Sequence, residues 1–210
     1  MDTKALEKFS YGLYVLTARD GVKDNGCIID TAIQAAFTPD QISICVNKDH
    51  FTRDMILKTK KFTISVLSQD VPFELIKHFG FYSGAKMDKF ADFKDCKRGE
   101  NDIYYITKGT NAFLSVHVDQ TLELGSHTLF VGKVTEMKVL NDKPSVTYEY
   151  YLNHIKPEEQ ETDKQEDGKT VWRCRTCGYE YVGAEIPEDF ICPVCKNPAS
   201  GFEKIVRKES

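Results

Sequence analysis

The sequence lacks the features of several well-known classes of protein. Lysine and arginine number 28 against 32 acidic residues, for a formal net charge of −4, whereas a nucleic-acid-binding protein needs a concentrated basic surface. No apolar run approaches the length of about 20 residues that a transmembrane helix needs. Residues 1–4 lack the charged-then-apolar order of a signal peptide. We therefore expect a cytoplasmic protein that binds neither nucleic acid nor membranes.

The sequence also lacks a Rossmann motif and the cysteine pattern of a disulfide-bonded protein. No G-x-G-x-x-G motif follows a predicted strand, so no Rossmann domain for a nicotinamide cofactor is visible. The cysteines number seven, of which four form two C-x-x-C pairs while Cys27, Cys45 and Cys96 are scattered. An odd count with clustered pairs favours metal binding in a reducing compartment over a disulfide framework.

The composition changes sharply once along the chain. Residues 157–168 are polar, mostly acidic and without a large apolar side chain, so they cannot bury enough surface to fold. We predict a large domain at residues 1–156, a solvated linker at 157–168 and a small domain at 169–210. A piece as small as the last usually needs a metal or disulfides to fold.

The large domain is predicted to be mainly β, with a few short helices. Alternation of apolar and polar side chains indicates strands at residues 41–46, 62–66, 112–118, 122–124 and 129–139, the last two separated by a turn at 125–126. Helical spacing is confined to residues 3–9, 52–60 and 72–78. Many short antiparallel strands with few helices indicate a closed or partly closed barrel.

The two cysteine pairs have the spacing of a metal site. Cys174 and Cys177 form one pair, Cys192 and Cys195 the other, and residues 178–191 separate them. A two-residue gap lets both thiolates of one turn reach the same ion, and two such turns make a tetrahedral site of four sulfurs. That geometry suits both zinc and iron, so the spacing alone predicts a metal ion without choosing between them.

The residues around the pairs resemble rubredoxins. The two metal-binding turns of that family are matched by residues 172–181 (WRCRTCGYEY) and 190–195 (FICPVC). An aromatic shell tunes an iron potential and is superfluous for zinc. The residues expected to form this shell are Trp172, Tyr179, Phe190 and Phe202. The resemblance therefore implies a one-iron centre, although Lys196 departs from the glycine that usually follows the fourth cysteine.

Residues 3–155 resemble flavin reductases with the FMN-binding split-barrel fold. Four segments carry the likeness. The first consists of residues 11–17 and 25–34, the second of residues 42–48 and 51–52, the third of residues 80–90 and the fourth of residues 124–133. In the family, the first of these segments holds the isoalloxazine ring of the flavin and the second binds the FMN phosphate. The cofactor-binding residues implied by the resemblance are Asn25, Gly26, Cys27, Ile28, Thr31, Ala32, Ile33, Gln34, Asn47, Lys48, Phe51, Thr52, Ser83, Gly84 and His127.

Some of these residues also carry a chemical signal of their own. Asn47 and Lys48 precede a helix predicted to start near Phe51, and a helix N-terminus attracts a phosphate; a simple polar turn is the alternative. Thr31 and Gln34 have side chains that can hydrogen-bond the polar edge of a flavin, and an edge strand explains them equally well.

His127 and the scattered cysteines are interpreted in the same way. Taken alone, His127 is a structural hydrogen bonder, whereas the resemblance implies a catalytic role beside the flavin or the nicotinamide. Cys27 falls in the flavin-holding segment, where packing of a small residue is favoured. Cys45 alternates on a strand and is expected to be a buried small hydrophobe, and Cys96 is expected in an exposed loop.

Together the two domains resemble the high-molecular-weight rubredoxins of anaerobic bacteria. The resemblance implies electron flow from NADH or NADPH through FMN to the iron, and on to a redox partner such as a flavodiiron protein. It also implies a homodimer. Two alternatives stay open: a flavin-binding carrier that takes electrons from another protein, and a free-flavin reductase whose C-terminal zinc ribbon only binds partners.

Overall fold

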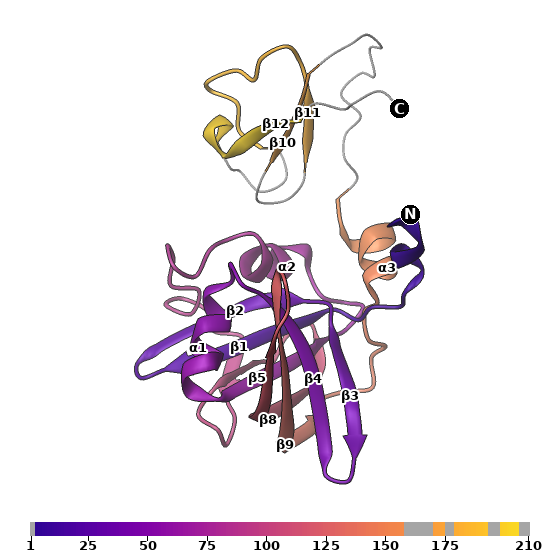
Figure 1. Ribbon diagram of the computed structural model, residues 1–210, viewed down its shortest axis with the longest axis vertical. Helices are drawn as coiled ribbons and strands as arrows, with labels where there is room; N and C mark the ends of the chain where they lie inside the picture. Colours follow the sequence, from indigo (N-terminus) through magenta and orange to yellow (C-terminus); the bar gives the residue numbers. More distant parts are fainter. Residues whose placement is uncertain (1–2, 158–169, 175–178, 193–197, 206–210) are drawn as a thin grey trace. The chain divides into compact units, whose positions relative to one another are not determined.

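The computed structural model describes residues 3–157, 170–174, 179–192 and 198–205. The chain divides into two compact units, Met1–Lys156 and Pro157–Ser210 (Figure 1). Apart from Pro157, the predicted linker lies outside the described residues. Within the described ranges, no helix has the length and apolarity needed to span a membrane.

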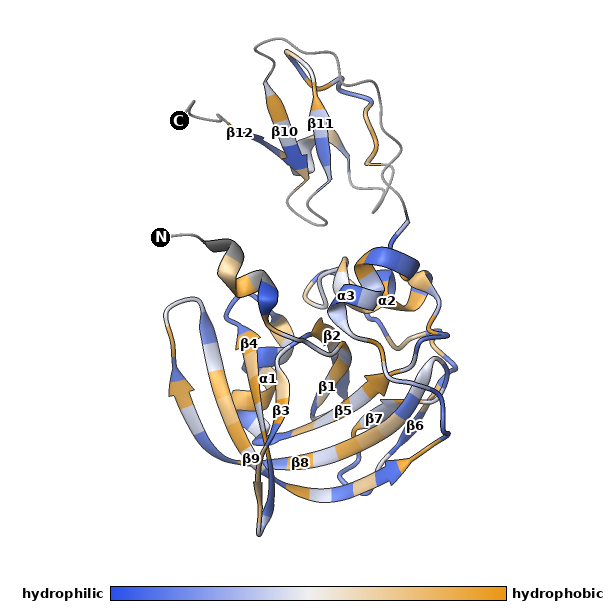
Figure 2. Cartoon of the chain, turned by 90° about the vertical axis from the view of Figure 1, so that its right-hand side faces the viewer, coloured by the Kyte–Doolittle hydropathy of each residue, from blue (hydrophilic) through white to orange (hydrophobic). Residues whose placement is uncertain are grey.

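The first unit is built on a seven-stranded antiparallel sheet with the strand order β2-β1-β5-β8-β9-β4-β3. The strands are β1 (Tyr14–Asp20), β2 (Lys23–Ile29), β3 (Ala32–Phe37), β4 (Asp40–Asn47), β5 (Lys61–Leu67), β8 (Thr110–Glu123) and β9 (His127–Val139). Figure 2 shows the sheet strongly curved, with β8 and β9 sweeping across the base of the unit. The prediction of a mainly β domain is confirmed.

Short helices and a small hairpin complete this unit. They are η1 (Thr3–Lys8), α1 (Phe51–Thr59), α2 (Phe73–Gly80), β6 (Cys96–Arg98), β7 (Tyr104–Ile106), α3 (Tyr148–Tyr150) and the π-helical η2 (Tyr151–Ile155). The helices predicted at 52–60 and 72–78 match α1 and α2 within two residues at each end. The helix predicted at 3–9 is a 3₁₀ helix.

Strand β1 is buried on both of its faces. Val15 and Leu16 are each 0% exposed, although successive side chains of a strand point to opposite sides. Val15 lies in a core with Phe79 of α2, and Leu16 lies in a second core with Ile56 of α1. Because both faces are apolar, β1 has no polar alternation, and the pattern that indicated β4, β5, β8 and β9 does not reveal it.

Strand β8 is longer than the alternation predicts. The segment predicted at 112–118 and the first two residues of the segment predicted at 122–124 belong to one strand, in which the register shifts after Ser115 and again after Val118. Such bulges break the period of two and bend the strand, which explains the apparent gap. The predicted turn at residues 125–126 is confirmed as the connection from β8 to β9.

Two predictions about cysteines are wrong. Cys45 is half-buried, because Ile44 and Val46 occupy the buried face of β4 and the intervening side chain points the other way. Cys96 begins β6 instead of lying in an exposed loop. It is half-buried against the core of α2, and its thiol donates a hydrogen bond to the Phe93 carbonyl (3.4 Å).

The second unit contains a three-stranded sheet with the order β11-β10-β12. Its elements are β10 (Val171–Cys174), β11 (Glu180–Val182), η3 (Ala199–Gly201) and β12 (Phe202–Ile205). Phe190 lies at the centre of an aromatic cluster, with ring centroids 4.7 Å from Tyr181, 5.5 Å from Phe202 and 6.4 Å from Tyr179. The predicted shell residue Trp172 lies on β10, where its indole N–H donates to the Gly183 carbonyl (3.2 Å).

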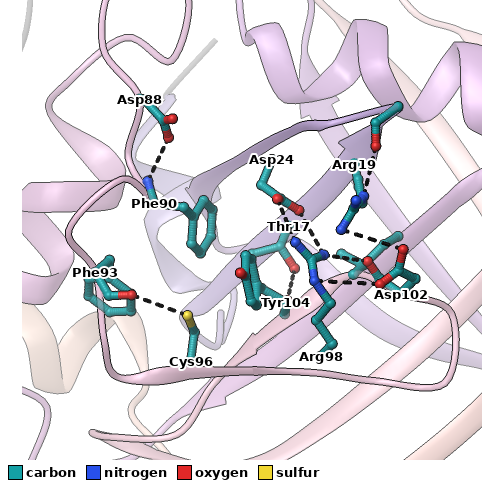
Figure 3. A network of polar contacts seen from close by, with 12 residues as sticks. Thr17, Arg19, Asp24, Asp88, Phe90, Phe93, Cys96, Arg98, Asp102 and Tyr104 are labelled. Atoms are coloured by element: carbon teal, nitrogen blue, oxygen red, sulfur yellow. Dashed lines mark hydrogen bonds and ion pairs between the residues drawn. The ribbon is translucent and has the colours of Figure 1, made fainter.

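An ion pair ties the β6–β7 hairpin of the first unit to the start of β2. Figure 3 shows the Arg98 guanidinium between two carboxylates, making two hydrogen bonds to Asp24 (2.8 and 3.1 Å) and an ion pair with Asp102 (3.4 Å). The guanidinium also lies 3.8 Å from the centre of the Tyr104 ring. The Asp24 side chain is only 11% exposed, so loss of Arg98 would leave a nearly buried carboxylate without its ion-pair partner.

We expect the substitution Arg98→Met to lower the free energy of unfolding by about 2 kcal/mol, because Asp24 is left as a nearly buried charge without its partner. Lys58→Met is the matched control, since it removes a lysine 70% exposed and paired with Asp20, and we expect it to cost less than about 0.5 kcal/mol. Urea denaturation followed by far-UV circular dichroism measures both. Equal losses would contradict a structural role for the Arg98 pair.

Candidate functional site

The N-terminus of α1 meets the ends of β4 and β9. Asn47, the last residue of β4, pairs with His127, the first residue of β9. The backbone N–H of Lys48 donates to the Ser126 carbonyl (3.1 Å). His50 is the N-cap of α1, and no side-chain hydrogen bond caps this helix. The first N–H groups of the helix and its dipole therefore favour an anion here.

Two cations lie beside this helix terminus and share one carboxylate. Glu123 contacts the Lys48 ammonium (3.1 Å) and the Arg53 guanidinium (2.9 Å), and it accepts a hydrogen bond from Thr128 (3.0 Å). The hydrogen bond from Lys48, with those from Thr128 and the charge of Arg53, lowers the pKa of Glu123. Of this group the sequence predicted only Lys48.

Three predicted residues from distant segments meet at the start of α1. The Asn25 amide donates to the Thr52 hydroxyl (2.9 Å), and both side chains are buried. The Asn25 oxygen Oδ1 is buried and has no hydrogen-bond partner among the described residues. Gly84 lies directly against it, since a Cβ at Gly84 would stand 2.0 Å from that oxygen. Only glycine therefore fits this position without displacing Asn25.

Lys89 holds these segments together from inside the unit. Its side chain is almost fully buried, and its ammonium donates to the carbonyls of Gly26 (2.7 Å) and Phe79 (2.8 Å). Burial lowers the pKa of Lys89 to about 8. The predictions did not include Lys89 as a site residue, although it lies within the segment 80–90 that carries the family likeness.

Two titratable side chains pack near Lys89. Cys27 lies in the apolar core, as predicted, and burial raises the pKa of its thiol to about 11. Burial, with the charges of Lys89 and His127, lowers the pKa of His50. The nitrogen Nδ1 of His50 is buried without a hydrogen-bond partner in the described part of the chain. His50 was also missed, because nothing in its sequence context shows that it is half-buried with its Nδ1 turned away from solvent.

The predicted flavin-edge residues lie around strand β3, at the edge of the sheet. The Thr31 hydroxyl donates to the Cys45 carbonyl (2.9 Å), and the Gln34 amide reaches the Asp40 carboxylate (3.2 Å). The Ala32 carbonyl accepts a hydrogen bond from the Tyr14 hydroxyl (3.3 Å). Thr31 and Gln34 thus have hydrogen-bond partners on β4 within the structure.

The remaining predicted residues are more dispersed. Ile28 packs toward α2, on the opposite side of β2 from Cys27. Ser83 and Ile33 are exposed. Phe51, the first residue of α1, packs against the core next to that helix. The structure therefore gathers Asn25, Thr52 and Gly84 at the start of α1 and leaves Ile28, Ile33 and Ser83 outside that cluster.

His127 lies at the edge of the cluster. It is half-buried, and its Nδ1 lies 2.8 Å from the Ser126 hydroxyl. Pairing with Asn47 places it beside the turn that precedes α1.

The residues of this cluster fit a flavin mononucleotide. The uncapped helix terminus with Lys48 and Arg53 is suited to a phosphate. The unpartnered polar atoms on Asn25 and His50 cost stability, and such groups are typical of sites that contact a ligand. Gly84 lets the backbone approach closely.

The second unit places two of the four predicted metal ligands in its interior. Cys174, at the end of β10, is 1% exposed, and Cys192 is 0% exposed. The backbone N–H of Cys174 donates to the Tyr179 carbonyl (2.8 Å). Buried thiolates are soft ligands that suit a tetrahedral iron or zinc site. Cys177, Cys195 and Lys196 lie outside the described residues.

Comparison with known families agrees with both units. Residues 6–158 match the flavin reductase like domain, and residues 172–203 match the rubredoxin-like domain of rubrerythrin. The chain therefore belongs to the flavin reductase-like family and carries a rubredoxin-like domain at its C-terminal end. The resemblance predicted from the sequence motifs is confirmed.

Individual relatives share this arrangement wholly or in part. The chain is 35% identical to the high molecular weight rubredoxin of Moorella thermoacetica, over 98% of this chain and 100% of that protein. It is 35% identical to the ferric-chelate reductase (NAD(P)H) of Archaeoglobus fulgidus, over 72% of this chain and 90% of that protein. The NADH:FAD oxidoreductase of Streptomyces globisporus C-1027 has a similar fold, with a TM-score of 0.61 and 24% identity over 69% of this chain and 84% of its own.

We expect Gly84→Ala to weaken FMN binding about tenfold, which corresponds to about 1.4 kcal/mol, because the new methyl group must displace Asn25 from its bond to Thr52. Gly125→Ala is the control, since a Cβ there meets nothing within 4 Å. Quenching of FMN fluorescence on titration with each protein measures the affinity. Equal dissociation constants for the two variants would show that Gly84 does not shape the flavin site.

A second prediction concerns the buried charge of Lys89. Between the folded-state pKa of about 8 and the ordinary value of 10.5, the unfolded chain binds more protons than the folded chain. The stability that Lys89 contributes therefore rises with pH across this window, by about 3 kcal/mol. We expect the difference in unfolding free energy between the Lys89 protein and its Lys89→Met variant to grow accordingly.

Both proteins in this comparison carry Cys27→Ala, because the raised pKa of the Cys27 thiol gives a pH dependence of the opposite sign. Urea denaturation followed by far-UV circular dichroism at pH 7.5 and 10.5 measures the difference. A difference that is constant with pH would rule out a buried, titrating ammonium.

Proposed function

We propose that this protein transfers electrons from NADH or NADPH, through FMN held in the first unit, to a one-iron tetrathiolate centre in the second. The observation that carries the proposal is the presence in one chain of a flavin reductase-like unit and a rubredoxin-like unit with buried cysteines. The 35% identity to a ferric-chelate reductase (NAD(P)H) supports a nicotinamide donor.

The residues of the first unit have distinct roles in this proposal. The α1 terminus, Lys48 and Arg53 bind the phosphate of FMN, and exchange of the Glu123 contacts for the phosphate releases both cations to it. Asn25 and Gly84 hold one side of the cofactor. A bound flavin supplies the chemistry that links a two-electron hydride donor to a one-electron acceptor.

His127 is proposed as the proton-handling residue beside the flavin. The Ser126 hydroxyl occupies Nδ1, which orients the ring and leaves Nε2 as the nitrogen to donate or accept a proton.

In the second unit, Cys174 and Cys192 are proposed to bind the iron together with Cys177 and Cys195. An iron with four thiolate ligands exchanges one electron at a time. The cluster of Tyr179, Phe190 and Phe202 would limit the access of water to the sulfurs, which tunes the potential.

The linker and the partners complete the proposal. We propose that residues 157–168, which are acidic and polar in composition, act as a linker that lets the small unit reach the flavin and then a partner, and that a redox protein such as a flavodiiron protein is the acceptor. We further propose a homodimer in the cytoplasm, on the basis of the family resemblance.

Anaerobic mixing of the full chain with NADH or NADPH tests this relay. We expect the flavin and ferric-thiolate absorption bands both to bleach in the wild-type protein. In Cys192→Ser the iron band should be absent, while the flavin bleaches at a rate within about twofold of the wild type, because the two sites lie in separate units. Flavin bleaching with no iron band in the wild-type protein would instead indicate a zinc site, and no bleaching at all would indicate a passive carrier fed by another protein.

A further inference from the structure

Lys89 carries a buried charge that the roles proposed above leave unused. The residue is 3% exposed, and its ammonium donates only to backbone carbonyls, those of Gly26 (2.7 Å) and Phe79 (2.8 Å). Within the described ranges, no carboxylate forms an ion pair with this ammonium. A buried cation without a counter-charge costs free energy, and a neutral amide can donate to two carbonyls equally well. The hydrogen bonds alone therefore do not account for the charge.

The ammonium lies in the wall of the cluster at the start of α1. Gly26 follows Asn25, whose buried Oδ1 has no partner among the described residues, and the segment that carries Lys89 places Gly84 against that oxygen. The charge also acts across the cluster, because after burial it is the next cause that lowers the pKa of His50, the N-cap of α1. A ligand in the cluster is therefore within electrostatic reach of Lys89.

Lys89 is also the one cation of the cluster that the phosphate of FMN does not offset in the proposed function. Lys48 and Arg53 share Glu123 in the structure and exchange it for the phosphate dianion. Glu123 is 50% exposed, so water screens its charge. The charge of Lys89 is buried and screened much less, and it favours a ligand that gains negative charge.

We infer that Lys89 makes the first unit bind reduced flavin more tightly than oxidised flavin, and thereby raises the reduction potential of the bound cofactor. The inference rests on the proposed function and adds a residue to it. A hydride carries two electrons and one proton, so its transfer to the neutral flavin ring gives a reduced ring with one negative charge, while the nicotinamide donor is oxidised. Attraction to Lys89 stabilises this charge. The reduced cofactor then stays in place while the one-iron centre accepts its two electrons one at a time.

Anaerobic equilibrium dialysis of the full chain against FMN, either oxidised or reduced with dithionite, tests the inference. We expect Lys89→Met to lose about tenfold in affinity for reduced FMN and less than about threefold for oxidised FMN. A tenfold loss of this preference corresponds to a fall of about 30 mV in the potential of a two-electron couple. Lys58→Met removes an exposed lysine in the last turn of α1 and is the matched control, with an unchanged preference.

The titration of Lys89 provides a second measurement that needs no variant. Burial lowers its pKa to about 8, and a negative charge on the reduced ring raises it again, so binding of reduced FMN takes up a proton above pH 8. The preference for reduced over oxidised FMN is therefore fully present below pH 8 and is lost as the pH rises. We expect it to fall about tenfold between pH 7.5 and 10 in the wild-type chain and to stay constant in Lys89→Met.

The other titratable groups around Lys89 do not produce this result. Burial raises the pKa of Cys27 on β2 to about 11, and burial lowers the pKa of His50 below its ordinary value of 6.5, so neither group titrates between pH 7.5 and 10. His78 of α2 contacts the Lys89 carbonyl through Nε2 (2.7 Å), and Asp88 is exposed. Both are present in Lys89→Met, and the comparison of the two proteins cancels their contributions.

The outcomes separate the inference from the proposed function. Equal losses of affinity for the two forms of FMN in Lys89→Met, or a wild-type preference that does not change with pH, would make Lys89 a structural tie only and overturn the inference, while the relay stands. If Lys89→Met does not fold, the pH dependence of the wild-type chain decides. A wild-type chain that binds neither form of FMN overturns the proposed function, and the inference with it.

Discussion

The geometry of the first unit's site depends on the hydrogen bonds made by one cation, the ammonium of Lys89. It is buried, and it donates to the carbonyls of Gly26 on β2 and Phe79 on α2. A buried cation must keep its partners, because loss of either leaves it unsolvated. The segment that contains Lys89 therefore has one placement relative to β2, and this placement brings Gly84 against Asn25. The cluster at the start of α1 follows from that contact.

The two chemical regions of the first unit lie at the two ends of the segment that runs from β2 into β3. Asn25, near the start of β2, faces Thr52 at the α1 terminus, where Lys48 and Arg53 suit an anion. Asp30, between the strands, lines a cavity of about 710 Å³ between the segment before β1 and the region of α3. One continuous segment thus contacts both regions. Asn25 therefore joins Thr52 and Arg53 of α1 in the anion-binding region, whereas Asp30 belongs to the cavity.

The sequence predicted the elements that neighbouring residues specify. It did not predict a strand that is buried on both faces or a charged side chain that is buried. Strands β4, β5, β8 and β9 showed an alternation of apolar and polar residues, whereas β1 did not, because Val15 and Leu16 are buried on opposite faces. Asn25, Thr52 and Gly84 were predicted from family-like segments. Lys89 was missed because lysine is rarely buried, and nothing local marks the partners that compensate its charge.

The sequence by itself determined the features that neighbouring residues specify. These are the spacing of the cysteine pairs, the polar composition of residues 157–168, the turn at 125–126 and the family of each unit. Only the tertiary structure decided which charges meet, since Lys89 and Gly26 are 63 residues apart and Arg53 and Glu123 are 70 apart. The reason is physical: a hydrogen bond or an ion pair depends on distance in space, and folding brings these atoms together through the packing of whole strands.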